Sequence, residues 1–345
     1  MSTGTPGTTD VADEATTSTA PVPDEQLTAL ATVLAPLGRA SRAERLTGGM
    51  FATTFLVTFD DGTDAVVKTA PTQQDRLLTY EHDLIRSEAL VYRLLADVPG
   101  VPVPRVLLED VTRSVWPGDL VAASRLPGTP WGDCGLGTVD EDPRAARAQH
   151  ELGALMARLH TVTGPVFGYV GEGSALRART WPSAFTAMVE AALRDAERWA
   201  VPIPGQEVRA ALTRHRAALA QVRTPSLVHT DLWPGNLFLD PSTGVIVGVI
   251  DPERAIWGDP LFELVGADQL GRGPVPDGLL AGYASVGTAP DLDDEAARVR
   301  IELYRLYFAL IMRVELVPRA YVGDWVDGHR STLETNLRAA LDSLA

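Results

Sequence analysis

Short apolar runs alternate along the chain with longer segments in which apolar residues recur at helical spacing. In the first third, the runs Phe55–Phe59 and Ala65–Lys68 flank Asp60–Thr63, whose Asp-Gly pair is typical of a hairpin turn. Two further runs, at 101–107 and 120–126, are expected to form strands as well. The pattern therefore predicts a β-rich region near the N-terminus.

Helical spacing dominates the rest of the chain. The segment 143–160, for example, begins with a proline and places Ala148, Leu152 and Leu159 on one face. The predicted helices are 24–37, 76–96, 143–160, 182–200, 206–222, 261–267, 292–317 and 331–344. An α+β protein is expected, with a small β-rich part followed by a larger, mainly helical part.

The segment 227–263 carries the clearest chemical signal. It contains His229, Asp231 and Asn236 in the order His-x-Asp-x-x-x-x-Asn, followed by an apolar run that ends at Asp251. Phosphoryl transfer requires a carboxylate that accepts the proton of the attacking hydroxyl, and oxygen ligands that hold Mg²⁺ against the triphosphate. We therefore assign Asp231 as proton acceptor, Asn236 and Asp251 as metal ligands, and His229 as a brace of the catalytic loop.

The surroundings of this motif distinguish it from a coincidence. Asp and Asn are also common loop and cap residues, and the spacing alone arises by chance. Here the apolar run Ser226–Val228 precedes the histidine and Leu237–Leu239 follows the asparagine. Turn residues at 240–244 then lead into Val245–Ile250, a β-branched run that ends at Asp251. One coherent strand–loop–strand–turn–strand unit favours the kinase interpretation.

The segments HTDLWPGN, 229–236, and VIDPE, 249–253, resemble the aminoglycoside phosphotransferase and choline kinase family. The resemblance extends over about residues 40–320. It implies a bilobal, protein-kinase-like fold with an N-lobe at 24–126 and a helical C-lobe at 127–345. It also implies that the chain moves the γ-phosphoryl group of ATP to a hydroxyl of a small acceptor, with Mg²⁺.

The same resemblance implies a nucleotide site in the N-lobe. Gly48 and Gly49 bring backbone N–H groups close to phosphates, because glycine adds no Cβ. Thr53 and Thr54 continue this turn, where relatives often have asparagine. Lys68 stands where the kinase fold places a positive charge on the α- and β-phosphates. A Gly-Gly pair is more often an ordinary turn, and a lone lysine is usually solvated, so the kinase order of these residues carries the assignment.

Two further elements complete the expected nucleotide site. Glu88, on the predicted helix 76–96, is expected to orient Lys68, and Glu81 is a rival because it lies two turns earlier on the same face. The link between the lobes is assigned to 122–126, with Ala123, Ser124 and Leu126 contacting adenine. Backbone groups read adenine in such links, so the side chains carry little signal.

Composition excludes several classes of protein. The net charge of −15 argues against a nucleic-acid partner, because phosphate binding needs a basic surface. A cationic acceptor, such as an aminoglycoside antibiotic or an amino sugar, is compatible with this charge, although many proteins are acidic for solubility alone. No window reaches the length of a membrane span, so no membrane partner is expected. The single Cys134 and the absence of a basic leader predict a cytoplasmic protein, and the polar residues 1–23 predict a disordered tail.

The spacing of the motifs favours a small acceptor over a protein. About 100 residues, largely helical, separate Pro127 from His229, and only seven residues lie between Asp251 and Asp259, which leaves no room for a long activation loop. Two alternatives remain. The HxDLWxGN motif resembles that of fructosamine (ketosamine) kinases, although Gly258–Leu261 departs from their pattern. A nucleotide-binding pseudokinase scaffold is the second alternative, but such a scaffold need not retain Lys68 and the three acidic and amide groups.

Four other residues near the motif have open roles. His160 ends a predicted helix and is expected to cap or pack. Asp259 is expected to be structural, although relatives have an acidic residue nearby that braces the catalytic loop. Glu253 either reaches a second metal or faces solvent. Trp233, inside the loop, either lines the acceptor pocket or packs on its own lobe.

Overall fold

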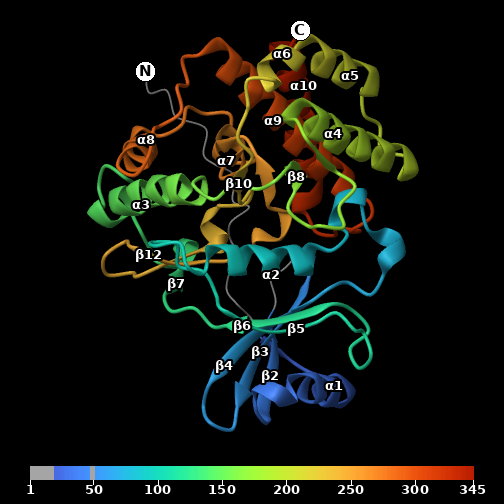
Figure 1. Ribbon diagram of the computed structural model, residues 1–345, viewed down its shortest axis with the longest axis vertical. Coiled ribbons are helices and arrows are strands. Elements are labelled where there is room, and N and C mark those ends of the chain that lie inside the picture. Colours follow the sequence, from blue (N-terminus) through green and yellow to red (C-terminus); the bar gives the residue numbers. More distant parts are fainter. Residues whose placement is uncertain (1–18, 47–50) are drawn as a thin grey trace.

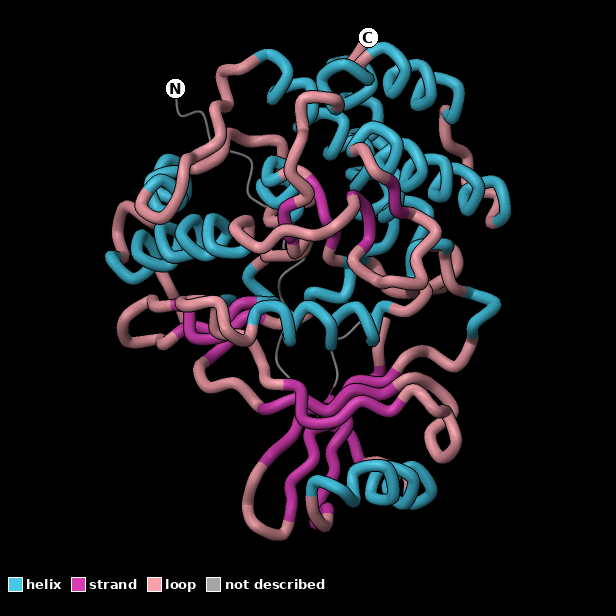
Figure 2. The backbone as a smooth tube through the Cα atoms, in the orientation of Figure 1, coloured by secondary structure: helices cyan, strands magenta, loops and turns pink. Residues whose placement is uncertain are grey.

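The chain folds into a β-rich part and a larger helical part, joined so that helix α2 (Leu84–Leu95) lies between them (Figures 1 and 2). The computed structural model describes residues 19–46 and 51–345. The expected α+β arrangement, with the sheet early and the helices late, is confirmed. The site residues lie on segments that face one another across the junction of the two parts.

The N-terminal part is built on one antiparallel sheet in the order β1-β2-β3-β4-β6-β5. Its strands are β1 (Thr19–Pro21), β2 (Ala40–Leu46), β3 (Thr53–Phe59), β4 (Asp64–Thr69), β5 (Val106–Asp110) and β6 (Leu120–Ser124). The hairpin β3–β4 is the one that the Asp-Gly turn predicts. The strand β1 lies within the segment expected to be a tail and pairs with β2, whereas residues 1–18 lie outside the described residues. β2 was not expected from the apolar pattern, because its residues are mostly polar and half-exposed.

Every second residue of β3 is buried, and these residues pack against the first helix. Phe55, Val57 and Phe59 are buried, and they pack with Leu30 and Leu34 of α1 (Asp24–Leu34) in one apolar cluster. A single 3₁₀ turn, 35–37, ends this helix. The sheet is therefore covered on one face by α1 (Figure 1).

The helix expected at 76–96 begins later than the periodicity indicates. α2 starts at Leu84, because Asp83 has a left-handed backbone with φ of 63° that interrupts the helix. The preceding segment forms two 3₁₀ turns, and its polar groups bind other parts of the chain. Thr79, for example, donates from its N–H and its hydroxyl to Asp195 at 2.8 and 2.9 Å.

The helical part has one large apolar core with aromatic rings at its centre, including Trp181, Phe185, Phe262 and Tyr304. Its helices are α3 (Pro143–Leu159), α4 (Trp181–Arg198), α5 (Gly205–Arg214), α6 (Arg216–Leu219), α7 (Pro260–Gly266), α8 (Asp277–Ala284), α9 (Glu295–Glu315) and α10 (Trp325–Ser343). The single helix expected at 206–222 is divided at His215, whose Nε2 contacts the Leu344 carbonyl at 2.9 Å. The last helix begins at Trp325, one and a half turns before the expected start.

Two small sheets carry the catalytic segment. One has the order β10-β13-β8-β9 and the other β12-β11-β7. Their strands are β7 (Thr129–Pro130), β8 (Phe167–Tyr169), β9 (Arg177–Ala178), β10 (Ser226–Val228), β11 (Leu237–Leu239), β12 (Ile246–Val249) and β13 (Ile256–Gly258). The predicted strand–loop–strand–turn–strand unit is therefore present.

In the described part of the chain, no helix combines the length and the apolar character that crossing a membrane requires. The helices pack instead around the aromatic core or cover the small sheets (Figure 1).

Candidate active site

The catalytic segment leaves β10 and is held by a buried carboxylate. Glu263, which is 0% exposed, accepts the backbone N–H groups of His229 at 2.6 Å and Thr230 at 2.9 Å. Thr230 has a φ of 74°, a left-handed conformation that is uncommon for a threonine. Two buried hydrogen bonds to one side chain stabilise this turn, which sets the direction in which Asp231 points.

His229 links the two halves of the catalytic segment. Its Nε2 lies 3.0 Å from the Ile250 carbonyl, and its Nδ1 lies 3.3 Å from the backbone N–H of Asp231. Since a carbonyl only accepts and an N–H only donates, these contacts assign the proton to Nε2. The ring thus holds the loop against the residue that precedes Asp251.

Asp231 is surrounded by three donors. Gln269 donates to its Oδ1 at 2.8 Å, Asn236 donates to its Oδ2 at 3.1 Å, and Arg254 lies 3.3 Å from the same Oδ2. Burial raises the pKa of Asp231, and the guanidinium of Arg254 opposes this rise. The carboxylate is therefore oriented from three sides, with a pKa above its ordinary value.

Lys68, Glu88 and Asp251 form a closed set of contacts. The Nζ of Lys68 lies 2.9 Å from Glu88 Oε1 and 2.6 Å from Asp251 Oδ1. Tyr92 donates to Glu88 at 2.7 Å and accepts the backbone N–H of Asp251 at 3.1 Å. The ammonium group of Lys68 thus joins strand β4, helix α2 and the segment that follows β12. The rival Glu81 contacts Arg319 and the backbone N–H of Leu78 instead.

The charges of this set are strongly coupled. Burial lowers the pKa of Lys68, but the carboxylates of Asp251 and Glu88 outweigh it and hold the pKa well above its ordinary value. Burial likewise raises the pKa of Asp251, but the Lys68 ammonium outweighs it, so the pKa lies below its usual range. For Glu88 burial prevails, and its pKa is raised. At neutral pH the lysine and Asp251 are both charged.

The oxygen atoms near Asp251 suit a hard cation. One carboxylate oxygen each from Glu88, Asp251 and Glu253 lie within 4.8 Å of one another. Asn236 uses its amide nitrogen on Asp231, so its amide oxygen points away from that contact and can serve as a ligand. Burial, followed by repulsion from Asp251, raises the pKa of Glu253 well above its ordinary value. An oxygen-only, acidic donor set fits Mg²⁺.

The other residues expected to bind the nucleotide occupy the sheet and its edge. Thr54 pairs with Lys68 across β3 and β4, and Thr53 begins β3. Ala123 lies within the β6 ladder, while Ser124 uses its N–H and its hydroxyl oxygen on the backbone of Arg105, both at 2.9 Å. The Leu126 side chain lies against Gly248. Gly48 and Gly49 lie outside the described residues.

The structure shows what surrounds the residues whose roles the sequence left open. Asp259 caps α7 and accepts from Arg300 at 2.8 Å and from the Tyr304 hydroxyl at 2.6 Å, so it is structural. Glu263, four residues later, holds the catalytic loop instead. His160 contacts the Tyr283 hydroxyl at 2.8 Å and lies 3.7 Å from Glu263. Trp233 is 44% exposed in the loop, available to a ligand.

Sequence reasoning missed Arg254, Gln269 and Glu263, all of which contact the catalytic segment. Glu263 gave a signal, because it is an acidic residue on the apolar face of a short predicted helix. Arg254 and Gln269 gave none, since a single Arg or Gln in a loop is ordinary surface composition. Their roles depend on tertiary packing that brings 254 and 269 to the same carboxylate.

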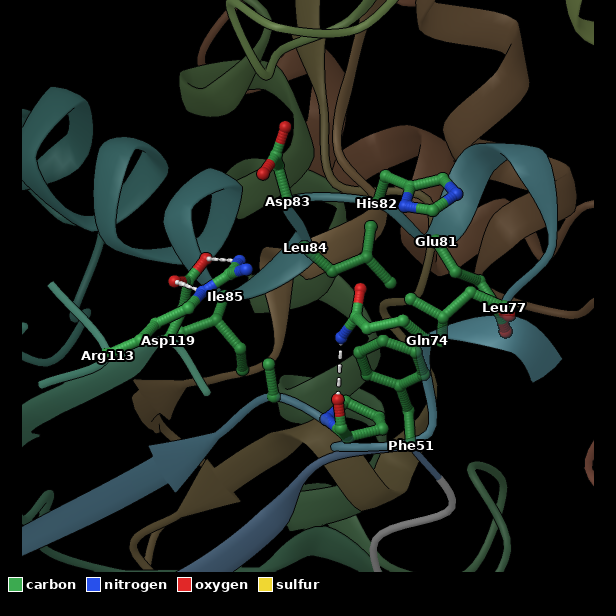
Figure 3. A pocket seen from close by; sticks show the side chains of 12 residues that line it. Phe51, Gln74, Leu77, Glu81, His82, Asp83, Leu84, Ile85, Arg113 and Asp119 are labelled. Carbon is green, nitrogen blue, oxygen red and sulfur yellow. Dashed lines mark hydrogen bonds and ion pairs between the residues drawn. The ribbon is translucent and has the colours of Figure 1, made fainter. Parts of the chain in front are cut away.

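A cavity of about 230 Å³ lies apart from these groups, at the start of α2 (Figure 3). Phe51 and Gln74 lie on one side of it, and the Arg113–Asp119 ion pair lies on the other. Neither Lys68 nor any of the residues around Asp231 lines it. The cavity is thus distinct from the candidate active site.

The buried brace leads to a stability prediction. Glu263→Gln replaces one accepting oxygen by an NH₂ group that faces a backbone N–H, so one buried donor loses its partner. We expect the free energy of unfolding to fall by ~1–3 kcal/mol, because a buried unsatisfied polar group costs that much. Urea unfolding measures the change, with the exposed Glu295→Gln as control. Equal stabilities of the two variants would contradict the bracing role.

Comparisons with known proteins agree with this geometry. The phosphotransferase enzyme family model matches residues 42–298. A protein of Thermobifida fusca named as a fructosamine-3-kinase has a similar structure, with a TM-score of 0.62 and 25% identity over 88% of this chain and 95% of that chain. The expected fold and family resemblance are confirmed.

Two aminoglycoside phosphotransferases share the fold at lower identity. One is a thermostable mutant of APH(4)-Ia in a ternary complex with AMP-PNP and hygromycin B, with a TM-score of 0.60 and 18% identity over 91% of this chain and 98% of that chain. The other is the GDP and kanamycin complex of an APH(2″) enzyme, with a TM-score of 0.59 and 18% identity over 91% of this chain and 98% of that chain.

The matched region, 42–298, includes Lys68, Glu88, Asp231, Asn236 and Asp251, the groups that the structure brings together. These structural neighbours were solved with nucleotides bound, which agrees with a nucleotide as phosphoryl donor. The chain belongs to the phosphotransferase enzyme family and transfers a phosphoryl group to a hydroxyl of a small molecule.

Proposed function

We propose that the chain transfers the γ-phosphoryl group of ATP to a hydroxyl of a small acceptor, with Asp231 as the proton acceptor. The observation that carries this proposal is the pairing of two sets of groups across the junction. In the first set Lys68 contacts Glu88 and Asp251, which supports a role in binding phosphates. In the second set Asn236 contacts Asp231, which supports a base beside a metal ligand.

Asn236 and Asp251 would hold Mg²⁺, which neutralises charge on the phosphate oxygens when it is bound. Lys68 binds the phosphates and is itself kept charged by Glu88 and Asp251. Thr53 and Thr54 lie near the phosphates in this proposal. Ala123, Ser124 and Leu126 form the adenine side of the site in this proposal.

Asp231 orients the acceptor hydroxyl and receives its proton as the phosphoryl group leaves ATP. Gln269 and Asn236 fix the carboxylate, so little reorganisation is needed when the acceptor arrives. His229 holds the loop through Ile250 and takes no proton. Catalysis is then mostly positioning and charge neutralisation, as expected for a loose transition state.

The pKa of Asp231 leads to a prediction on pH. Activity requires the carboxylate, so kcat/KM should fall as the pH drops through the pKa of Asp231. Arg254→Met removes the charge that opposes the effect of burial, so this pKa should rise and the acid limb should move to higher pH. Arg254→Lys should keep most of the wild-type profile. An acid limb that stays in place in Arg254→Met would show that Arg254 does not control Asp231.

The acceptor class rests on the comparisons and on the absence of room for an activation loop. Aminoglycosides and amino sugars are candidates, because relatives of this fold bind hygromycin B and kanamycin. A fructosamine is the second candidate, on the 25% identity to the Thermobifida fusca protein. A cytoplasmic location, where ATP is supplied, belongs to the same proposal.

A screen of acceptors tests the proposal. Aminoglycosides, amino sugars, ketosamines, macrolides, neutral sugars and choline are each incubated with the full chain, Mg²⁺ and labelled ATP. Label should move to a small molecule with wild type and not with Asp231→Asn. Phosphorylation of a folded protein, with no small molecule labelled, would overturn it.

A further inference from the structure

A buried network of charges leads from Asp231 to the segment between α9 and α10. Arg254 lies 3.3 Å from Asp231 and 3.6 Å from Glu315. Arg319 lies 3.2 Å from the same Glu315 and 2.5 Å from Glu81. All five side chains are at most 16% exposed. The other two carboxylates of this network, Glu81 and Glu315, are thus each paired with a guanidinium.

This pairing determines which ligand charge the site can stabilise. An ammonium group of an acceptor binds well only to a carboxylate that is not already neutralised, because desolvation of both charges must be offset. Glu81 and Glu315 are shared with Arg319 and Arg254, and Asp231 must remain free to take the proton. An acceptor with an ammonium next to the reacting hydroxyl would also face the positive charge of Arg254.

Arg254 retains donors for a ligand. A guanidinium has five N–H donors, and the two carboxylate contacts of Arg254 engage two of its nitrogens. Its side chain is 14% exposed and lies next to the carboxylate that would orient the acceptor hydroxyl. Oxygen atoms of hydroxyl or carbonyl groups are the natural partners of such donors.

Aromatic rings continue the same network toward solvent. Arg319 donates to the Tyr321 hydroxyl at 2.9 Å, and the ring centroids of Tyr321 and Trp325 lie 5.5 Å apart. A second route of contacts reaches the same helix, since Gln269 donates to Asp231 and the next residue, Leu270, accepts from Asn336 of α10. Trp325 is 37% exposed, so an apolar ligand face can pack against it.

We propose that Arg254, with Arg319, makes this site selective for an uncharged, oxygen-rich acceptor and excludes polycations. The proposal rests on the function proposed above and narrows its acceptors, because it removes the polycationic aminoglycosides from the candidates named there. Arg254 donates to an oxygen of the acceptor beside the reacting hydroxyl, and the Tyr321–Trp325 pair packs against an apolar face of the same molecule. In this proposal the overall charge of −15 does not select the acceptor, because Glu81 and Glu315 are paired with guanidinium groups.

Calorimetric titration of the full chain, saturated with Mg·ADP at low salt, tests this with kanamycin as the polycationic probe. Wild type should bind kanamycin no more tightly than ~1 mM, the scale of weak association. Arg254→Gln frees Asp231 and Glu315 and removes one positive charge that repels the ammonium groups of kanamycin. The affinity for kanamycin should therefore rise at least ~10-fold. This gain should disappear as salt is added.

Three variants make the result specific. Arg254→Lys keeps the positive charge and should bind kanamycin as weakly as wild type. Arg319→Gln frees Glu81 and Glu315 and should also gain affinity, which preserves the test if Arg254→Gln does not fold. Arg209→Gln, which removes the partner of Glu190 at 2.9 Å on the exposed surface, should gain nothing.

Micromolar binding of kanamycin to wild type, or no gain in both glutamine variants, would overturn the proposal. Of the acceptors that wild type phosphorylates, the one with the highest kcat/KM should carry no ammonium group next to the modified hydroxyl. If that acceptor does carry such an ammonium group, the proposal is also overturned. A failure of the proposed function can be told apart from a failure of this proposal. In the first case, Mg·ATP turnover would be absent or would not change in Asp231→Asn, whether or not kanamycin binds.

Discussion

Asp231→Asn should lower turnover by ~10²–10⁴, the usual contribution of a positioned general base, while Mg·ATP binding stays within about threefold of wild type. The asparagine keeps the shape of the side chain and can still contact Gln269, but it cannot take the proton of the acceptor. Lys68 and Asp251 are not changed, so the phosphates keep their partners. Steady-state turnover and nucleotide titration separate the two effects.

The matched control is Asp140→Asn, since Asp140 is exposed and lies in a turn of the helical part. Its turnover should equal that of wild type. Turnover of Asp231→Asn within threefold of the control would remove Asp231 from the role of proton acceptor. A loss of nucleotide binding as large as the loss of turnover would instead show that Asp231 supports the nucleotide site.

Asp251→Asn should lower turnover by ~10²–10³, the size seen when one preorganised charge-stabilising group is removed. The change removes the negative charge that Lys68 contacts at 2.6 Å and that an oxygen-binding cation would need. The apparent affinity for Mg²⁺ should fall as well, and added Mg²⁺ should restore part of the activity. Titration of Mg²⁺ at fixed ATP measures both.

Asn236→Ala should show the same dependence on Mg²⁺, because its amide oxygen is the second proposed ligand. The exposed Asp293→Asn serves as control and should be indistinguishable from wild type. Unchanged turnover and unchanged affinity for Mg·ATP in both site variants would contradict the metal-binding role.

Local chemistry made the order of the elements predictable. The Asp-Gly turn between two apolar runs predicts the hairpin that ends at Lys68, and the apolar runs around Asp231 predict β10, β11 and β12 of the two small sheets. The apolar faces of α3, α4 and α9 repeat at helical spacing, so these helices were predicted within a few residues. In each case the signal lies within a window of one element.

The ends of the helices and the contacts that hold the catalytic loop could not be predicted from the sequence, because they depend on residues that are distant along the chain. Asp83 begins α2 in a left-handed conformation, and the periodic apolar residues before it pack without forming a helix. His215 divides α5 from α6 by contacting the end of the chain. Arg254 and Gln269 reach Asp231 only through the fold, and neither residue type marks a site when read alone.

The central claim is that the Asp231 carboxylate receives a small acceptor hydroxyl during phosphoryl transfer from ATP. The most direct measurement incubates the full chain with γ-labelled ATP, Mg²⁺ and the acceptor panel, and identifies the labelled product by mass spectrometry. The account predicts one labelled small molecule, phosphorylated on a hydroxyl, whose formation Asp231→Asn lowers by at least ~10²-fold. Equal labelling by wild type and Asp231→Asn, or label found only on protein, would contradict it.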